Sequence, residues 1–339
     1  MKKDSLVEVI KDRTKGRKKN IWLMRQAGRY LPEYHKVMQK SDNFISLCYT
    51  PNLVEELTLQ PIKRFDLDAA IIFSDILVVA DALGFDVEFI KGFGPKIHPI
   101  NNYLALKSEE EALERLLPIF EAVKSVRKNL QKEKALIGFA GGPWTVASYI
   151  IEGGSSKQLL QTKKMCYTDK YNFEFIMERL VDITTAYLMK KIESGADIIQ
   201  LFESNAGLLT GDVFDKWIIE PTREIVSSIR SKYPKFPIIG FPRNAGLFYK
   251  KYAMQTGISA ISVDYSMPIN WIKDNIELPI QGNLDPYLLA YDKTGAIEQA
   301  RKIMDCFADK PFIFNLGHGI IPDTPVEHVE ELVKFVNNY

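Results

Sequence analysis

Short apolar runs separated by much longer amphipathic stretches constrain the fold of this chain more than any other feature. A run of this kind is typical of a strand that is buried on both faces of a parallel sheet. There are eight such runs: Ile21–Met24, Ala69–Phe73, Leu136–Ala140, Ile198–Phe202, Pro237–Phe241, Ile258–Val263, Leu278–Gln281 and Phe312–Asn315.

The stretches between these runs have apolar residues at spacings of three and four and charges on the opposite face, which predicts amphipathic helices. The clearest are Glu110–Leu130, Asn172–Ser194, Val213–Tyr233 and Gly295–Phe307. Strands that alternate with helices form βα units, and eight units can close into a barrel. We therefore predict an α/β fold of the (β/α)8, TIM-barrel type. An open doubly wound sheet is less favoured, because no Gly-x-Gly-x-x-Gly follows an early strand.

The chain has 339 residues, a length that a single α/β barrel can accommodate. We expect one domain over residues 1–339. The basic run from Lys11 to Lys19 precedes the first predicted strand, and such runs usually stay solvated. We therefore expect this basic run to be a solvated arm before the first strand, and residues 1–20 to form an N-terminal arm.

The charge balance excludes several classes of partner. The 44 Lys and Arg and the 43 Asp and Glu leave a formal charge of +1, so no overall field attracts nucleic acid or an anionic membrane. The cysteines at 48, 166 and 306 lack the spacing of a zinc site or a disulfide framework. There is no apolar segment of signal-peptide or membrane-span length. We expect a cytoplasmic protein with no metal or organic cofactor.

Polar side chains gather directly after the predicted strands. Because the C-terminal ends of barrel strands meet at one rim, and barrel enzymes carry their chemistry there, this pattern predicts the position of the site. The residues concerned are Arg25, Arg29, Asp75, Gly141 to Trp144, Glu203, Ser204, Arg243, Asp264, Asn283 and His318.

Three sets of candidate residues have alternative interpretations. Arg25 and Arg29 could bind a ligand with several carboxylates, because guanidinium groups are forked, permanently charged donors, or they could be structural arginines paired with acidic neighbours. Asp75 could point into the barrel mouth or simply cap the next helix. Tyr149, Ser204 and His318 could likewise be ordinary core or capping residues.

Two long segments carry a resemblance to a known family. They are Met24-Arg25-Gln26-Ala27-Gly28-Arg29-Tyr30-Leu31-Pro32-Glu33-Tyr34 and Gly138-Phe139-Ala140-Gly141-Gly142-Pro143-Trp144-Thr145, the latter extending through Tyr149 to Gly153. Both resemble signatures of the uroporphyrinogen decarboxylase family. Shorter matches follow in the same order, at residues 72–77, 202–204, 281–286 and 315–319.

The resemblance implies an α/β barrel, a homodimer and a cofactor-independent removal of the acetate carboxyls of uroporphyrinogen to give coproporphyrinogen. It implies that Asp75 accepts hydrogen bonds from the pyrrole N–H groups and that Arg25 helps to deliver or relay a proton. A pyrrole protonated at a ring carbon is its own electron sink, so a fixed carboxylate that stabilises the developing cation is needed in place of a cofactor.

The resemblance also implies substrate contacts for the loop from Arg25 to Arg29, with Gln26, Ala27 and Gly28 between them, and for Tyr149, Ser204 and His318. Phe139 and Phe202 are candidate apolar walls, although barrel packing explains them nearly as well. This chain departs from the family pattern at three positions, Ala80, Gly142 and Asn205. Of these, Asn205 is expected nearest the site, where it could alter substrate contacts.

Two other functions remain open from the sequence. Related barrel methyltransferases use a zinc-bound thiolate or a corrinoid partner, but none of the three cysteines follows a predicted strand beside a histidine. His35, His98 and His328 also form no pair with metal-ligand spacing. A tetrapyrrole binder without catalytic activity would be expected to lose Asp75 or Arg25, and both are present.

Overall fold

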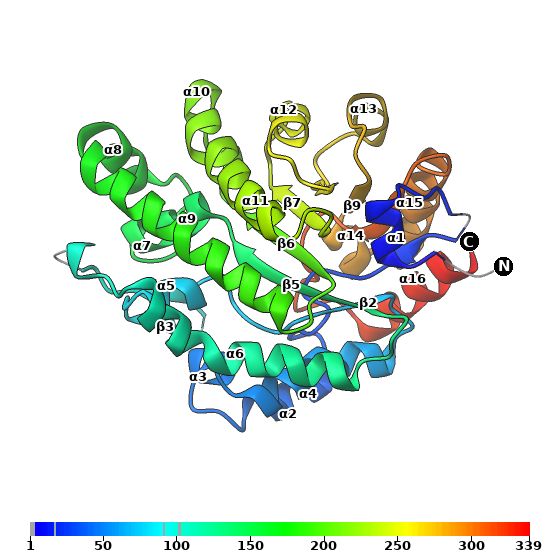
Figure 1. Cartoon of the computed structure of the whole chain (residues 1–339). Helices are drawn as coiled ribbons and strands as arrows, with labels where there is room; N and C mark the ends of the chain where they lie inside the picture. Colours follow the sequence, from blue (N-terminus) through cyan, green and yellow to red (C-terminus); the bar gives the residue numbers. More distant parts are fainter. Residues whose placement is uncertain (1–3, 17, 91, 101–102) are drawn as a thin grey trace.

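The predicted strands form one eight-stranded parallel sheet that curls into a nearly closed barrel, with helices around its outside (Figure 1). The computed structural model describes residues 4–16, 18–90, 92–100 and 103–339. The strand order is β1-β10-β9-β8-β7-β6-β5-β2. The bounds are Asn20–Ile21 (β1), Ala69–Ile71 (β2), Ala135–Gly141 (β5), Ile198–Glu203 (β6), Ile238–Pro242 (β7), Ala260–Ser262 (β8), Ile280–Leu284 (β9) and Phe312–Leu316 (β10). Each of the eight predicted runs overlaps one strand of this sheet, and the barrel is confirmed, although β1 shares only Ile21 with its predicted run, Ile21–Met24.

The seam between β1 and β2, the two ends of this strand order, is bridged by Asp68. The backbone N–H of Ile21 donates to Asp68 Oδ2 at 2.6 Å, and the N–H of Asp68 donates to the carbonyl of Ile21 at 2.9 Å. A side-chain carboxylate thus replaces part of the backbone ladder here. The two backbone groups of Ile21 are satisfied even though β1 and β2 form no regular pair.

The helices predicted from periodicity are present with small shifts at their ends. Val213–Tyr233 is interrupted by a π-helical turn, η3, between α10 and α11. The helix bounds are Pro32–Met38 (α2), Phe44–Cys48 (α3), Pro51–Arg64 (α4), Val78–Ala82 (α5), Glu109–Asn129 (α6), Pro143–Glu152 (α7), Leu160–Thr168 (α8), Lys170–Glu193 (α9), Gly211–Phe214 (α10), Asp215–Ile219 (η3), Glu220–Lys232 (α11), Phe248–Gln255 (α12), Ile269–Asn275 (α13), Pro286–Tyr291 (α14), Lys293–Cys306 (α15) and Val326–Asn338 (α16). In the described part of the chain, no helix has both the length and the apolar character that a membrane crossing requires.

A short helix near the N-terminus closes the barrel at the N-terminal ends of its strands. Helix α1 (Leu6–Lys11) buries Leu6, Val9 and Ile10. Their cluster includes residues at or near the starts of strands: Ala69, Ala135, Ile198, Ala260 and Ile313. The predicted N-terminal arm over residues 1–20 thus contains a packed helix that the sequence analysis did not predict, because apolar residues at spacings of three and four lie on one face of it. Residues 1–3 and 17 of the predicted arm lie outside the described residues.

An antiparallel hairpin between β2 and α6 was not predicted. Strands β3 (Val87–Ile90) and β4 (Gly94–Ile97) pair with Val87 opposite Ile97. The ring of Phe89 lies 4.6 Å, centroid to centroid, from that of Phe44 on α3. The hairpin is thus packed onto the helical layer, and Gly94, with φ +90, begins its second strand in a conformation that favours glycine.

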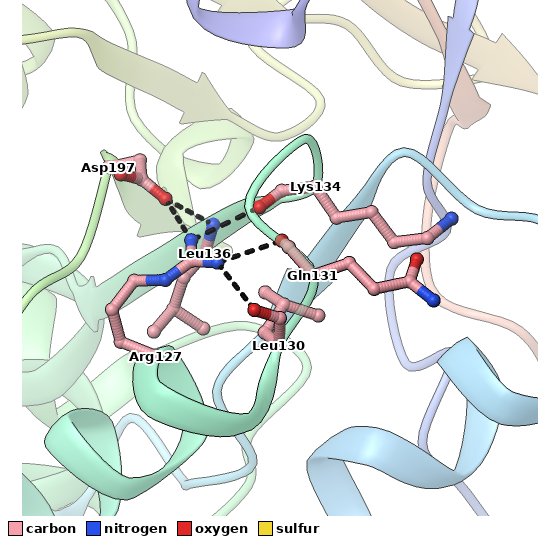
Figure 2. A network of polar contacts seen from close by, with 6 residues as sticks. All are labelled: Arg127, Leu130, Gln131, Lys134, Leu136 and Asp197. Carbon is pink, nitrogen blue, oxygen red and sulfur yellow. Dashed lines mark hydrogen bonds and ion pairs between the residues drawn. The ribbon is translucent and has the colours of Figure 1, made fainter.

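The loops at the N-terminal ends of the strands are tied together by one arginine (Figure 2). Arg127 on α6 donates to Asp197 Oδ2 at 2.6 Å and to the carbonyls of Leu130, Gln131 and Lys134 at 2.9 to 3.1 Å. The same Asp197 oxygen accepts from the N–H of Leu136, at the start of β5. This guanidinium joins α6, β5 and the segment before β6, and every contact it makes is with protein.

Candidate active site

The loop after β1 begins with an unusual backbone conformation at Arg25, whose φ is 61°. This left-handed turn is held by Gln26, which is fully buried. Gln26 Oε1 accepts from the N–H of Leu23 at 3.1 Å, and its Nε2 donates to the carbonyl of Ala69 at 3.0 Å. The side chain of Gln26, predicted to contact the substrate, therefore lies beneath the loop and supports it.

Arg25 and Arg29 project from this loop and are both exposed. Within the described residues, neither guanidinium forms an ion pair or a hydrogen bond with another side chain, apart from longer-range electrostatic influences. A Cβ on Gly319 would lie 2.4 Å from Arg25 Cδ, so only glycine leaves room for Arg25 to cross this segment. Desolvation lowers the pKa of Arg25, an effect that Asp75 opposes. The structural-arginine alternative is thus not what the contacts support.

Asp75 follows β2, and one of its two carboxyl oxygens makes the capping contact that the sequence left open. Its Oδ1 accepts from the N–H of Leu77 at 2.8 Å, a local capping contact just before α5. Within the described residues no donor contacts Oδ2. Burial raises the pKa of Asp75 to about 6, while the Leu77 hydrogen bond and the charge of Arg25 act in the opposite direction. One oxygen thus fixes the carboxyl group and the other remains available to a ligand.

The remaining predicted side chains come from three further elements. Tyr149, on α7, and Ser204, after β6, are half-buried, and in the described part of the chain their hydroxyls have no hydrogen-bond partner. Tyr149 and Asp75 both influence the charge of Arg25. His318, after β10, has its Nε2 2.9 Å from Nη1 of Arg243, which follows β7. Arg25 is thus within electrostatic reach of Asp75, Tyr149 and His318.

Glu203, at the end of β6, joins this strand to the start of helix α7. It is fully buried, and its carboxylate accepts from the N–H groups of Trp144 and Thr145 at 3.2 and 3.0 Å and from the Thr145 hydroxyl at 2.6 Å. It thereby caps the start of α7, which carries Tyr149. Burial raises the pKa of Glu203 to about 7, against these hydrogen bonds.

The three departures from the family pattern lie in or beside helices α5 and α7. A Cβ on Gly142 would lie 2.1 Å from Glu203 Cδ, so glycine makes room for the capping carboxylate. Asn205 Nδ2 donates to Ser148 Oγ at 2.7 Å, which directs this side chain to α7. Ala80 is fully buried in α5. Asn205 was expected nearest the site, where it could alter substrate contacts, and its amide group is engaged with α7.

Phe139 and Phe202, the candidate apolar walls, pack edge to face with ring centroids 5.5 Å apart, and Phe202 packs in the same way on Phe241 at 6.1 Å. Phe139 is 9% exposed. These rings come from neighbouring strands β5, β6 and β7, and they form an apolar floor below the charged groups.

Sequence reasoning missed two cations near this floor. Arg243 was recognised only as a rim residue, without a role. Lys191, on α9, is fully buried, and its Nζ donates to the carbonyl of Phe139 at 2.7 Å. Burial moves the pKa of Lys191 well below its ordinary value. No signal in the sequence distinguished this lysine from Lys190 beside it, because the helical face that each occupies is set only by packing.

The hairpin brings His98 to two carboxylates that the sequence did not connect with it. His98 Nε2 lies 3.9 Å from Asp86 Oδ2 and 3.7 Å from Glu88 Oε2. Potential ligand atoms of these three residues lie within 4.8 Å of one another. Cross-strand ion pairing accounts for this arrangement. The other two histidines contact carbonyls, His35 that of Arg29 and His328 that of Leu289.

This fold and rim place the chain among the (β/α)8 barrel enzymes. It matches the uroporphyrinogen decarboxylase (URO-D) family over residues 1–339. It is 55% identical to the uroporphyrinogen decarboxylase of Wolbachia sp. subsp. Drosophila simulans (strain wRi), covering 99% of both chains. It is 48% identical to that of Neorickettsia sennetsu, covering 94% of this chain and 97% of the relative. The chain belongs to the uroporphyrinogen decarboxylase family, and the predicted family membership is confirmed.

Among solved structures, a methyltransferase from Methanosarcina mazei has a TM-score of 0.81 at 19% identity, covering 98% of this chain and 97% of that one. This likeness concerns the fold alone. All three cysteines of the present chain lie on helices, Cys48 on α3, Cys166 on α8 and Cys306 on α15. None of them follows a barrel strand, which is where a zinc-bound thiolate of the methyltransferase kind would be expected.

Proposed function

We propose that this protein is a uroporphyrinogen decarboxylase, which converts the acetate side chains of uroporphyrinogen to methyl groups and yields coproporphyrinogen in the biosynthesis of haem and other tetrapyrroles. The observation that carries the proposal is Asp75, a carboxyl group held through one oxygen after β2 and under the electrostatic influence of Arg25, whose guanidinium has no ion pair within the described residues. Membership of the family over the whole chain supports it.

Each turnover at an acetate consumes one proton and releases one CO₂. A proton delivered to a ring carbon of the pyrrole makes the ring cationic, the bond to the carboxylate carbon then breaks, and its electron pair neutralises the ring and leaves an exocyclic methylene. A proton added to this methylene gives the methyl group, and loss of the ring-carbon proton restores the pyrrole, so the net consumption is one proton. We assign to Asp75 the recognition of pyrrole N–H groups and the stabilisation of the ring cation, because a preorganised carboxylate acts strongly on charge that develops nearby. Arg25 is the candidate for delivering or relaying the proton.

The eight carboxylates of the substrate need several cationic or N–H partners. We propose that Arg25 and Arg29 bind carboxylates through charge-assisted hydrogen bonds. The backbone N–H groups of Ala27 and Gly28 have no acceptor within the described residues and are suited to the same purpose. The hydroxyls of Tyr149 and Ser204 and the ring of His318 are assigned to the remaining substrate contacts.

We also propose that residues 1–339 form a single domain, that the protein acts as a cytoplasmic homodimer and that it needs no metal or organic cofactor. The continuous hydrophobic core that runs from β1 to α16 supports the first of these proposals. Sedimentation at micromolar concentration tests the second, and a clean monomer of 38.7 kDa would count against it.

The direct test of the proposed activity is anaerobic incubation of the purified protein with uroporphyrinogen, followed by a count of the carboxyl groups in the products. We expect the count to fall from eight to four. Products that keep all eight carboxyls, formed by a folded protein that still binds the substrate, would identify a binder without catalytic activity.

A further inference from the structure

The contact between Arg243 and His318 determines the chemical form of the histidine. Arg243 Nη1 lies 2.9 Å from His318 Nε2. A guanidinium has donors only, so the imidazole nitrogen must accept and cannot itself carry a proton. His318 is therefore neutral in this arrangement, and its ring proton is on Nδ1.

Burial and the neighbouring arginines also favour a neutral His318 ring. Desolvation lowers the pKa of His318 to about 3, with Arg25 and Arg243 adding to the effect. The Gly319 backbone and Asp264 raise it to a smaller extent. These groups come from the segments after β1, β7, β8 and β10, which together surround the ring.

The backbone of Arg243 is held from β6 and the segment that follows it, and the next residue is held by Asp264 after β8. Its N–H donates to the carbonyl of Glu203 on β6 at 3.0 Å, and its own carbonyl accepts from Gly207 at 3.0 Å. The next residue, Asn244, has φ 60°, and its N–H donates to Asp264 Oδ2 at 2.7 Å. Asp264 is fully buried and also accepts from the hydroxyl of Tyr249 at 2.6 Å. The backbone at Arg243 therefore has little freedom to move away from His318.

We propose that Arg243 is a positioning residue that holds the His318 ring neutral and in the tautomer protonated at Nδ1, so that the ring meets the substrate as an uncharged hydrogen-bond partner. This proposal rests on the proposed substrate contact of His318. A neutral ring keeps the same hydrogen-bonding character across the neutral pH range, whereas an ordinary histidine changes its charge there. Substrate affinity then does not depend on the titration of this residue.

The first experiment reads the ring directly and does not depend on enzymatic activity. Histidine labelled with ¹⁵N in the full-length protein gives ring signals, and His318→Gln identifies that of His318. In the wild type we expect a neutral ring protonated at Nδ1 from pH 5 to 8. In Arg243→Leu we expect the pKa of His318 to rise and the two tautomers to mix. A protonated ring or an Nε2–H tautomer in the wild type would overturn the proposal, as would an unchanged signal in Arg243→Leu.

Two further variants separate position from charge. Arg243→Lys retains the cation, so the ring should stay neutral while its orientation loosens, and this variant serves if Arg243→Leu fails to fold. Lys235→Gln removes one exposed cation from the segment before the same strand, β7, and is the matched control. It should leave both the ring signals and the KM unchanged. If the pKa of His318 shifted in this control as much as in Arg243→Leu, the effect would arise from the overall charge of the protein and the proposal would be overturned.

The second experiment is a double-mutant cycle on the KM for uroporphyrinogen. Arg243→Leu should raise KM by about tenfold at pH 7, in line with the loss of a charge-assisted hydrogen bond. In a His318→Gln background the same change should raise KM by less than about twofold, because Arg243 acts through the ring. Equal effects in the two backgrounds would contradict the proposal. If the protein does not decarboxylate uroporphyrinogen at all, only this cycle is lost, and the ring signals still decide the role of Arg243.

Discussion

The two ends of the barrel treat arginine in opposite ways. At the N-terminal ends of the strands, the guanidinium of Arg127 is occupied by a carboxylate and three carbonyls (Figure 2). At the C-terminal ends, Arg25 and Arg29 are exposed without an acidic partner among the described residues. The same type of side chain thus ties loops together at one end and is left exposed at the other, where we propose that it binds the carboxylates of the substrate.

The two ends also differ in what they bury. At the N-terminal ends of the strands, α1 packs Leu6, Val9 and Ile10 against residues at the strand starts, and these apolar side chains close the barrel. At the C-terminal ends, burial disfavours the charged forms of Asp75 and Glu203 and raises their pKa values to about 6 and about 7. One end is built to contribute stability, whereas the other accepts unfavourable burial of charge, which is typical of functional sites.

The largest expected difference between the two ends of the barrel is in their contribution to the free energy of unfolding. Ile10→Ala removes a fully packed side chain from the closed end, so the free energy of unfolding should fall by about 2 to 5 kcal/mol. Turnover per folded molecule should not change. Thermal and denaturant melts measure the loss, with the exposed Lys11→Ala on the same helix as control. If Ile10→Ala and the control had the same melting temperature, the packing of α1 at the end of the barrel would not contribute to stability.

A pair of arginine variants tests the comparison itself. Arg127→Ala should lower the free energy of unfolding by roughly 1.5 to 3 kcal/mol, toward the lower value because the Arg127–Asp197 pair is partly exposed. Arg29→Ala should leave the melt unchanged and weaken substrate binding by a similar free energy, more strongly at low salt. If Arg29→Ala destabilised the fold and left binding intact, Arg29 would be a structural arginine after all.

The ionisation of Asp75 predicts a pH dependence. The pKa of Asp75 is raised to about 6, so the carboxylate that the mechanism requires is lost as the pH falls below that value. We expect kcat/KM to fall about tenfold per pH unit well below pH 6, because this ratio reports the free enzyme. For stability the sign is the reverse: the folded state holds this proton more tightly, so the contribution of Asp75 is largest at low pH and is lost as the pH rises through about 6. A flat kcat/KM from pH 5 to 8 would argue against an ionised catalytic Asp75.

The smallest expected effect is that of chelation. Exhaustive dialysis against a chelator should leave turnover unchanged, because the pyrrole of the substrate serves as its own electron sink. His98, Asp86 and Glu88 lie close together on the hairpin, so metal content must be measured alongside activity. Loss of turnover that a divalent metal restores would require a different mechanism.

The elements that the sequence predicted are those that depend on local pattern. Apolar runs located all eight strands, and the residues directly after them located Arg25, Asp75 and His318 at one rim. The contact of Arg243 with His318 joins residues 75 positions apart, and the capping of α7 by Glu203 spans 58 or 59 positions. Such contacts depend on how neighbouring strands align, which no local pattern records.

Two misses have a different cause. Helix α1 was hidden because the basic residues around Leu6, Val9 and Ile10 suggested a solvated segment, whereas burial depends on one face of a helix only. The hydrogen bonds of Gln26 were also unpredictable, because the family signature does not distinguish a side chain that touches the substrate from one that supports the loop beneath it.

The central claim is that the carboxylate of Asp75 performs chemistry and does more than cap a turn. The most direct measurement is the turnover of Asp75→Asn with uroporphyrinogen, made on protein whose thermal melt matches the wild type. Asn keeps the shape and can still accept from the N–H of Leu77, but it carries no charge. We predict that this variant folds and binds porphyrin yet turns over on the order of a hundredfold or more slowly, in line with lost electrostatic stabilisation. Near-normal turnover by the folded variant would contradict the account and leave Asp75 with its capping role alone.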